Sequence, residues 1–494
     1  MESHRSLIAL ICVVVYLAMC ILVGLWAMRR TKSTQDFFMA GRHLGIIVAS
    51  VAIFSSTMSG WGFVGGPGLV YKMGVSSFWM LISMAIGATI SFYLLAKRLR
   101  MLAEIRQLIS LPDAVQARYE SRTTSFLTAV AILAGVICYL GAQVLAMATV
   151  LQDILADVSW IGTLRLEVCL TVSCAVLVFY CVTGGIIASV YTDLVQGLIM
   201  VVAALLVMVT AASRVENGFT GMSAAILADD PEAMSPWGTL GMIGCLSWYF
   251  VFTLGACGQP HVITKLMMTR KVEDTRHMLP VSVIGYGLTA LLWIGVGLAI
   301  RTLVVQGQHP ELANADQAAA QFLQHYAHPI LSGIVFAALL SAIMSTADGF
   351  LNVGAAAIVH DIPRAIRGRS LTNELWWARV ATIVIAVLAA VFSLYAGELV
   401  ALLGALGWSA FAIAIVPTVA IGFNWKRATP LACNLAMIIG VGMNFGLKFA
   451  EVGLPYGFHG GALSLLVSLT VFYVVSIASS PKPIPQDIET LMDL

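Results

Sequence analysis

The chain has 494 residues, of which 60% are hydrophobic and 11% are charged, and its mean hydropathy is +0.92. This composition excludes an ordinary soluble globular protein and indicates a polytopic membrane protein whose main surroundings are a lipid bilayer. The formal net charge is only +2. Outside the short loops there is no basic face of the kind that phosphate backbones require, which excludes a nucleic-acid partner.

Apolar windows of about 20 residues follow one another through the chain and predict roughly thirteen transmembrane helices. The first stretch, residues 7–28, is too long for the apolar part of a signal peptide, and it ends in Arg29, Arg30 and Lys32 without a cleavage site. We therefore expect it to remain as a span. The predicted fold class is an all-α polytopic membrane protein with a single transmembrane domain over residues 1–482 and a short cytoplasmic tail over residues 483–494.

Basic residues are concentrated in alternate connections between the predicted spans. If the N-terminus lies outside, the inner connections carry most of the Lys and Arg, whereas the outer ones keep few, such as Arg214 and Arg301. The positive-inside rule then favours an outer N-terminus and a cytoplasmic C-terminus, and an odd number of spans agrees with this orientation. The short loops and compact chain suggest a multi-pass protein of a plasma membrane, in style a bacterial inner membrane.

The second apolar stretch is interrupted by the sequence SSTMSGWGFVGGPG at residues 55–68. Glycine and proline weaken a helix, and backbone groups freed in hydrocarbon cost several kcal/mol each unless protein or a watery cavity satisfies them. The break is therefore expected to line a site. Discontinuous helices whose carbonyl oxygens coordinate sodium or protons are a recurring feature of secondary transporters.

A second break, GACGQP at residues 255–260, lies five predicted spans after the first. Two interrupted segments at corresponding positions of two halves indicate a binding site near the membrane midplane, between inverted repeats. Glycines that only allow close helix packing are an alternative explanation, which we favour for Gly255 or Gly258 alone.

Polar residues also recur on one face of the predicted ninth span, at Ser341, Ser345, Asp348 and Asn352, with Thr346 beside them. Hydroxyl oxygens suit sodium, a hard cation, although single hydroxyls in membrane helices more often bond to the carbonyl one turn earlier. A carboxylate at membrane depth is costly and usually marks an ion pathway, a paired charge or a cavity. Asp193 is a second such carboxylate, with an interfacial acid as the competing interpretation.

These residues resemble the sodium/solute symporter family, and most closely its sodium/proline symporter branch. The resemblance covers most of the chain. Its motifs are Gly41-Arg42, Met58-Ser59-Gly60-Trp61, Gly65-Gly66-Pro67-Gly68, Tyr191-Thr192-Asp193-Leu194-Val195-Gln196, Gly258-Gln259-Pro260-His261 and Met344-Ser345-Thr346.

The resemblance implies the leucine-transporter fold, with five-plus-five inverted repeats at about residues 44–213 and 239–423. It also implies that sodium is the coupling ion and that alternating access carries sodium and a small solute into the cell. The implied sodium ligands are Ser55, Met58 and Ala342 through their carbonyls and Ser345 and Thr346 through their hydroxyls. Asp193 and Asp348 are implied for an exit route or a second cation, with a proton as the other possibility.

The candidate solute contacts implied by the motif match are Ser59, Gly60, Trp61, Tyr139, Trp248 and Phe252. Two positions differ from the proline branch: Thr57 stands where that branch has an aspartate, and Ala256 where it has an aromatic residue. Proline or a related amino acid is the expected solute. A monocarboxylate or pantothenate-like acid is the alternative, favoured by the missing negative charge at Thr57.

A function of another class is a transporter-like sensor module, which would need a separate signalling partner because no output domain is expected after residue 494. An enzyme is not expected. The sequence has no His/Glu metal motif and no nucleophile elbow, and His261 lies in a motif where a structural role is the more ordinary one.

Overall fold

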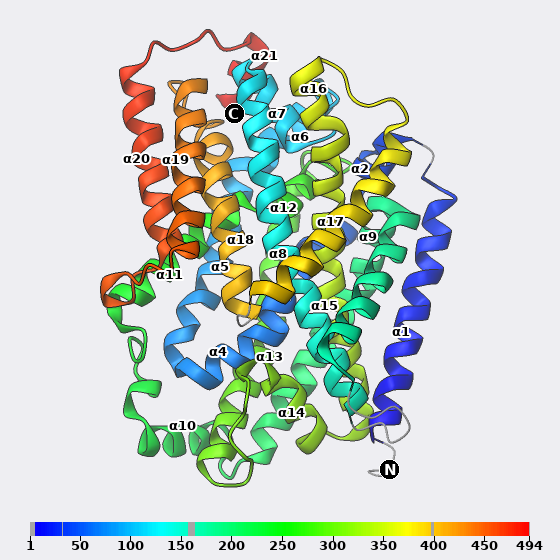
Figure 1. The fold of residues 1–494 in the computed structure, drawn as a ribbon, viewed down its shortest axis with the longest axis vertical. Coiled ribbons are helices and arrows are strands. Elements are labelled where there is room, and N and C mark those ends of the chain that lie inside the picture. Colours follow the sequence, from blue (N-terminus) through cyan, green and yellow to red (C-terminus); the bar gives the residue numbers. More distant parts are fainter. Residues whose placement is uncertain (1–4, 32, 157–163, 397–399, 494) are drawn as a thin grey trace.

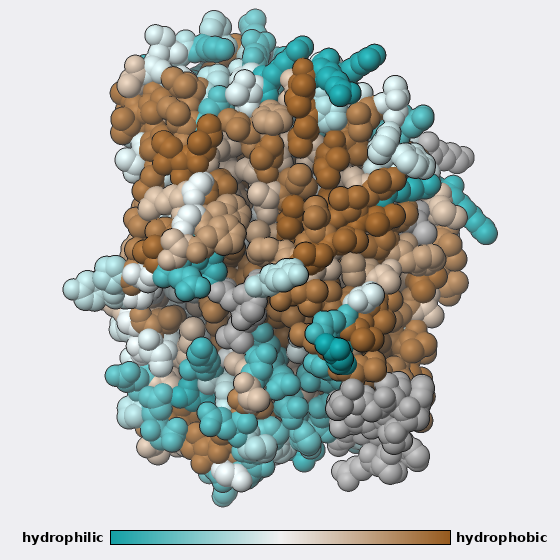
Figure 2. Space-filling model, in the orientation of Figure 1, coloured by the Kyte–Doolittle hydropathy of each residue, from teal (hydrophilic) through white to brown (hydrophobic). Residues whose placement is uncertain are grey.

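The computed structural model describes residues 5–31, 33–156, 164–396 and 400–493, and within these ranges the chain is almost entirely helical. Eleven described helices are long and apolar enough to cross a bilayer, and two shorter apolar helices, Ile46–Thr57 and Leu166–Phe179, accompany them. On the face shown in Figure 2, hydrophobic residues form a broad band between hydrophilic residues at the top and bottom. The predicted all-helical membrane architecture is confirmed, and the count of about thirteen spans stays a prediction.

The first half of the chain contains a peripheral helix, the first interrupted helix and two long core helices (Figure 1). Its elements are α1 (Arg5–Met28), α2 (Thr34–Met39), η2 (Ala40–Arg42), α3 (Ile46–Thr57), η3 (Trp61–Gly65), α4 (Gly66–Met73), η4 (Gly74–Ser77), α5 (Phe78–Ser91), η5 (Phe92–Ala96), α6 (Lys97–Ile105), α7 (Leu111–Tyr119), α8 (Arg122–Ala156) and α9 (Leu166–Arg214).

The second half contains the other interrupted helix, a long buried helix and two final hydrophobic helices. Its elements are α10 (Gly218–Asp229), η6 (Pro231–Met234), α11 (Gly241–Gly255), η7 (Ala256–Gly258), α12 (Pro260–Leu266), α13 (Asp274–Val305), η8 (Ala315–Gln317), α14 (Ala318–Tyr326), α15 (Pro329–Ala356), η9 (Ala357–Asp361), α16 (Ile362–Arg367), α17 (Glu374–Ala396), α18 (Val400–Ile415), η10 (Val416–Ile421), α19 (Pro430–Phe449), η11 (Pro455–Gly457), α20 (Gly460–Ala478) and α21 (Gln486–Met492).

The predicted break in the second apolar stretch is present between α3 and α4. Helix α3 stops at Thr57 because Met58 has φ −83° and ψ 84°, and the chain resumes as the π-helical turn η3. A β-carbon at Gly66 would lie 2.5 Å from Cδ2 of Trp293, and one at Gly65 would lie 3.0 Å from the backbone nitrogen of Ala401. Glycine here therefore allows the broken helix to pack directly against α13 and α18.

The second predicted break separates α11 from α12. The 3₁₀ turn η7 leads to Gln259, whose φ of −77° and ψ of 105° are non-helical, and Pro260 then begins α12. A β-carbon at Gly258 would lie 2.9 Å from Cα of Ala412. The close packing that sequence alone offered as an alternative therefore coexists with a genuine interruption of the helix.

Helices α15 and α18 form the centre of the molecule. In the most apolar window of the span that contains α15, 83% of residues are buried, and the figure for α18 is 94%, against 28% for α1. Helix α15 contacts α9, α1, α8 and α3. The polar face predicted on α15 is thus enclosed by protein rather than lipid.

The C-terminal tail contains the short helix α21, which packs beside α6 (Figure 1). Ile488 is fully buried, and Asp487 accepts two hydrogen bonds from Arg106, at 2.6 and 2.8 Å. Arg106 lowers the pKa of Asp487 by hydrogen bonding and charge. The tail is therefore attached to the helical domain.

Candidate functional site

The residues that the family resemblance implies as sodium ligands meet where the last turn of α3 contacts the middle of α15. The hydroxyl of Ser345 lies 3.0 Å from the carbonyl oxygens of both Ser55 and Ala342. The hydroxyl of Thr346 donates to the carbonyl of Ser56 at 2.7 Å and lies 3.2 Å from that of Ala342. All five residues are fully buried. The cluster consists of neutral oxygens, the ligand type that a hard monovalent cation prefers.

Met58, the fifth implied ligand, lies immediately after α3. Its backbone nitrogen donates to the carbonyl of Phe54 at 3.0 Å, which is the last helical bond before the break. The structure therefore brings four of the implied residues into direct contact and places the fifth at the end of the same helix.

The candidate solute contacts begin one residue later. The hydroxyls of Ser59 and Tyr139 are 2.9 Å apart, and Ser59 Oγ also accepts the backbone N–H of Trp61 at 3.1 Å. The N–H of Gly60 donates to Oε1 of Gln143 at 2.8 Å. Helix α8 thus supplies a tyrosine and a glutamine, four residues apart on one face, that hold the broken segment.

Aromatic rings from three interrupted or core helices stack next to these polar groups. Trp61 stacks on Phe252 with ring centroids 5.0 Å apart, and Phe252 stacks on Trp248 at 5.5 Å and on Trp408 at 5.3 Å. The indole of Trp61 donates to the carbonyl of Ala401 at 2.9 Å. The six candidate solute residues therefore lie in two connected groups, one of hydroxyl and backbone groups and one of aromatic rings.

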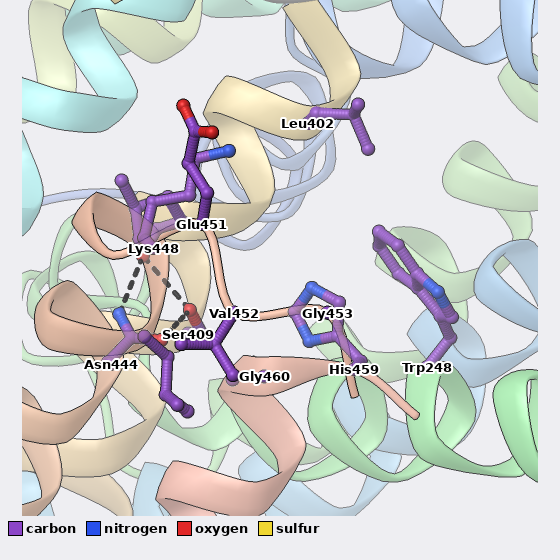
Figure 3. Close-up of a pocket in the computed structure, with 13 residues that line it drawn as sticks. Trp248, Leu402, Ser409, Asn444, Lys448, Glu451, Val452, Gly453, His459 and Gly460 are labelled. Carbon is purple, nitrogen blue, oxygen red and sulfur yellow. Dashed lines mark hydrogen bonds between the residues drawn. The ribbon is translucent and has the colours of Figure 1, made fainter. Parts of the chain in front are cut away.

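A cavity of about 430 Å³ borders this aromatic group at Trp248, and the end of α19 and the start of α20 line it. Figure 3 shows Trp248 and His459 on one side and Lys448 and Glu451 on the other. Trp248 and His459 are 4.2 Å apart between ring centroids. Burial lowers the pKa of His459 to about 4, and the charge of Lys448 acts in the same direction, so the ring is neutral at pH 7. The cavity is thus lined by Trp248, one of the candidate solute contacts.

Asp193 on α9 forms a buried ion pair with Lys265 on α12. The Lys265 ammonium donates to Asp193 Oδ2 at 2.7 Å, to the carbonyl of Ala52 at 3.1 Å and to the hydroxyl of Ser56. The two ion-pair side chains are 0% and 1% exposed. Asp193 is therefore a paired charge in the core, and the interfacial acid that sequence left open does not describe its position.

Asp348 lies on the other side of the same region. It accepts the Ser189 hydroxyl at 2.7 Å and lines a small cavity together with Phe37, Gly185 and Asn352. Gly185 has φ 55° and ψ −155° and breaks α9 into two helical segments. A carboxylate at a helix break and beside a cavity is the setting in which membrane-embedded acids handle ions.

Another cluster of ionisable side chains joins α7 to the end of the α15 span. His360 contacts Asp113 at 3.1 Å through Nε2 and Glu374 at 3.0 Å through Nδ1, and Arg364 bonds Asp113 at 2.8 Å. Asp113, His360 and Asp361 have the spacing of metal ligands. Because carboxylates engage both imidazole nitrogens, the arrangement is an ion-pair network. Burial raises the pKa of Asp113, but His360 and Arg364 outweigh it and leave that pKa lowered.

Asp316 connects the turn η8 to the first residue of α18. Its carboxylate accepts the backbone N–H of Val400 at 2.8 Å, and the neighbouring Ala315 carbonyl would lie 2.6 Å from a β-carbon at Gly68. The turn therefore sits directly on α4. Burial raises the pKa of Asp316 to about 6, although the Val400 hydrogen bond partly opposes this.

We expect the variant Asp316→Asn to change how stability depends on pH. In the wild-type protein the folded-state pKa of Asp316 is raised. The contribution of this carboxyl to the free energy of unfolding is therefore fully present below the unfolded-state pKa of about 4, and it is lost as pH rises through the folded-state pKa of about 6. The loss corresponds to about 3 kcal/mol. Thermal unfolding in detergent should show the asparagine protein gaining stability relative to wild type between pH 4 and 6. A difference that is constant across this range would contradict the prediction.

Sequence reasoning did not single out Gln143, Lys265 or Trp408. Gln143 has a signal that could have found it, because it is an amide at membrane depth one helical turn after Tyr139. Within the described part of the chain, its Nε2 and the indole nitrogen of Trp408 are buried without a hydrogen-bond partner. The Gln143 nitrogen is a candidate donor to a solute, whereas the Trp408 nitrogen packs directly against Gly255.

A family model described as "Sodium:solute symporter family" matches residues 37–440. Among curated proteins, the chain is 29% identical over 440 residues to the sodium/proline symporter of Escherichia coli, covering 86% of this chain and 85% of that protein. It is 28% identical over 438 residues to the osmoregulated proline transporter OpuE of Bacillus subtilis, with 86% of both chains covered.

Among solved structures, a sodium-coupled sialic acid symporter in a substrate-bound outward-open state has a TM-score of 0.80 at 17% identity. That alignment covers 97% of this chain and 98% of the other. The nucleobase-cation-symport transporter Mhp1 has a TM-score of 0.57 at 15% identity, over 92% and 98% of the two chains. The similarity confirms the fold that the sequence motifs implied.

Proposed function

Because the chain belongs to the sodium:solute symporter family, we propose that it couples the entry of sodium to the uptake of proline or a related amino acid. The observation that carries the proposal is the contact between Ser345 and Thr346 on α15 and the carbonyls at the end of α3. A cation held there would join an interrupted helix to the central one. An enzyme function is not supported, since the family consists of transporters.

The proposed mechanism follows from the order of groups along the broken segment. Ser55 and Ser56 face the sodium cluster, and Ser59, Gly60 and Trp61 face the candidate solute cluster. Sodium bound to the first group fixes the segment that carries the second, so each ligand favours the conformation that the other needs. Movement of this segment relative to α15 would then expose both ligands to the other side.

The energy available from one sodium ion is sufficient for scavenging a solute. One charge crossing 100 mV supplies about 2.3 kcal/mol, and a tenfold sodium gradient adds about 1.4 kcal/mol. Together they support roughly 500-fold accumulation of a neutral solute.

The proline assignment is supported by the relatives and by the groups in the site. The curated relatives named above are proline transporters, and the aromatic rings of Trp61 and Phe252 offer apolar area to a pyrrolidine ring. The Gln143 amide and the Ser59 and Tyr139 hydroxyls offer hydrogen bonds to a carboxylate. Thr57 is one of the two positions that differ from the proline branch, and its hydroxyl already donates to the carbonyl of Ile53 within its own helix.

The orientation, the location and the role of Asp348 belong to the same proposal. We place the N-terminus outside and the C-terminus in the cytoplasm, because basic residues gather at the end of the molecule that carries α21. Arg106 and Lys426 form ion pairs with α21, and α16, which contains Arg364, lies at the same end (Figure 1). A bacterial inner membrane is the proposed location, and a single domain over residues 1–482 is the proposed organisation. Asp348 is proposed to line the exit route of the sodium ion.

Uptake of labelled proline into proteoliposomes tests the proposal, with an inward sodium gradient or with potassium in its place. We expect accumulation in sodium only, and competition by unlabelled amino acids rather than by monocarboxylates or pantothenate. If sodium protects the protein against thermal unfolding but proline is not taken up, sodium remains the proposed coupling ion and proline is rejected as the solute. No response to sodium in either measurement would reject sodium coupling.

A further inference from the structure

The Lys265 ammonium on α12 is enclosed by oxygen atoms from two other helices, α3 and α9. Its partners are the carbonyl of Ala52 at 3.1 Å, Oδ2 of Asp193 at 2.7 Å and the hydroxyl of Ser56. A lysine ammonium has three N–H donors, and all three therefore have an acceptor. Lys265 and its three partners are fully buried.

The ammonium lies next to the proposed sodium cluster without being part of it. The Ser56 hydroxyl, which accepts from Lys265, donates to the carbonyl of Ser345 at 2.9 Å. The Ser56 carbonyl accepts from Thr346 at 2.7 Å and contacts His261 at 3.2 Å. One residue of α3 thus separates the lysine nitrogen from the hydroxyls of α15.

The oxygens around Lys265 form a set that a free monovalent cation could use. They comprise one carboxylate, one hydroxyl and one carbonyl, and the second carboxylate oxygen of Asp193 is buried without a hydrogen-bond partner in the described ranges. A buried carboxylate requires a compensating charge, and here the chain itself supplies it. Asp348 on α15 is the other carboxylate facing this region, and it bonds to Ser189.

We propose that Lys265 is a tethered cation that fills a second ion site formed by Ala52, Ser56 and Asp193, so that the protein couples each solute to one free sodium ion. This inference rests on the proposed sodium-coupled uptake and specifies its stoichiometry. The ammonium has the charge of a sodium ion but stays with the protein through the transport cycle. It therefore compensates the negative charge of Asp193, and no second sodium ion has to move down its gradient with each solute.

The stoichiometry is measured in proteoliposomes at alkaline pH and zero membrane potential, by finding the proline gradient that balances a fixed sodium gradient. With one coupled ion, a tenfold sodium gradient balances about a tenfold proline gradient, and with two ions about a 100-fold gradient. We expect about tenfold for the wild-type protein. A balance near 100-fold would overturn the proposal, whereas proline uptake that ignores sodium would reject the proposed function instead.

The variant Lys265→Ala removes the ammonium and keeps the three oxygens. We expect the proline gradient that balances a tenfold sodium gradient to rise to about 100-fold in this variant, because a free sodium ion replaces the lost charge. The matched control Lys265→Arg keeps a cation and should stay at about tenfold. An alanine variant that transports with a balance near tenfold would overturn the proposal.

The double variant Lys265→Met with Asp193→Asn provides a measurement if the alanine protein does not fold, because it removes both buried charges together. We expect sodium-coupled uptake to persist with a balance of about tenfold. Loss of sodium dependence in this folded variant would show that the pair belongs to the coupling site itself, and would overturn the proposal.

Discussion

Replacement of Ser345 by alanine is expected to weaken sodium-driven accumulation of proline strongly at sodium concentrations that saturate the wild-type protein. The variant removes a hydroxyl that lies 3.0 Å from two carbonyl oxygens at the junction of α3 and α15. A hydrogen-bonding group that acts on a charge contributes about 1.5–3 kcal/mol. The sodium concentration for half-maximal uptake should therefore rise at least tenfold, by about 1.4 kcal/mol per factor of ten.

Ser341→Ala is the matched control for this variant. Ser341 is on the same helix, is equally buried, and its hydroxyl donates to the carbonyl of Ala337 at 2.8 Å, one turn earlier. We expect its sodium dependence to match the wild-type protein. Equal losses in the two variants would point to a general disturbance of α15 and would contradict a specific sodium role for Ser345.

The second large effect is expected from Gln143→Leu, which should reduce proline uptake by about 10- to 100-fold. The variant leaves the buried N–H of Gly60 without its acceptor at 2.8 Å, and such a group costs about 1–3 kcal/mol. It also removes Nε2, the candidate donor to the solute. Initial uptake rates over a range of proline concentrations, at saturating sodium, measure both consequences.

Two further variants separate these consequences. Gln143→Glu keeps an oxygen for Gly60 but replaces the free donor with a carboxylate, so we expect a raised proline concentration for half-maximal uptake. Gln152→Leu is the control, because Gln152 is on the same helix and donates to the carbonyl of Leu164 at 2.8 Å, away from the break. Wild-type uptake by the glutamate variant would exclude a contact between Nε2 and the solute.

The Ser345→Ala and Gln143→Leu variants act on one short segment, through which the proposed mechanism links sodium to the solute. Ser55 and Ser56 end the helical part of α3 and contact α15, whereas Gly60 begins the next part and is held by α8. Only a few residues with non-helical backbone separate them. In the proposed mechanism, a change in sodium binding at Ser55 and Ser56 would therefore reposition the solute contacts directly.

Much of this protein follows from local chemistry in the sequence. Long apolar stretches cannot remain in water, so the helical membrane architecture was predictable from composition alone. Helix breaks were expected within residues 55–68 and 255–260, and both are present. They fall at Met58 and Gln259, whereas the neighbouring glycines and prolines lie in helical turns. Ser345 and Asp348 could be placed on one face of a helix because they are three residues apart.

Only the tertiary structure decided which of these groups compensate one another. Lys265 and Asp193 are 72 residues apart, and Gln143 and Gly60 are 83 apart. Sequence patterns report the periodicity of one helix, whereas such contacts depend on how separate helices pack. The sequence therefore predicted that Asp193 is a costly carboxylate at membrane depth, but it did not predict which residue compensates its charge. That residue, Lys265, is identified only by the packing of α3, α9 and α12, because helix packing determines which partners a buried charge has.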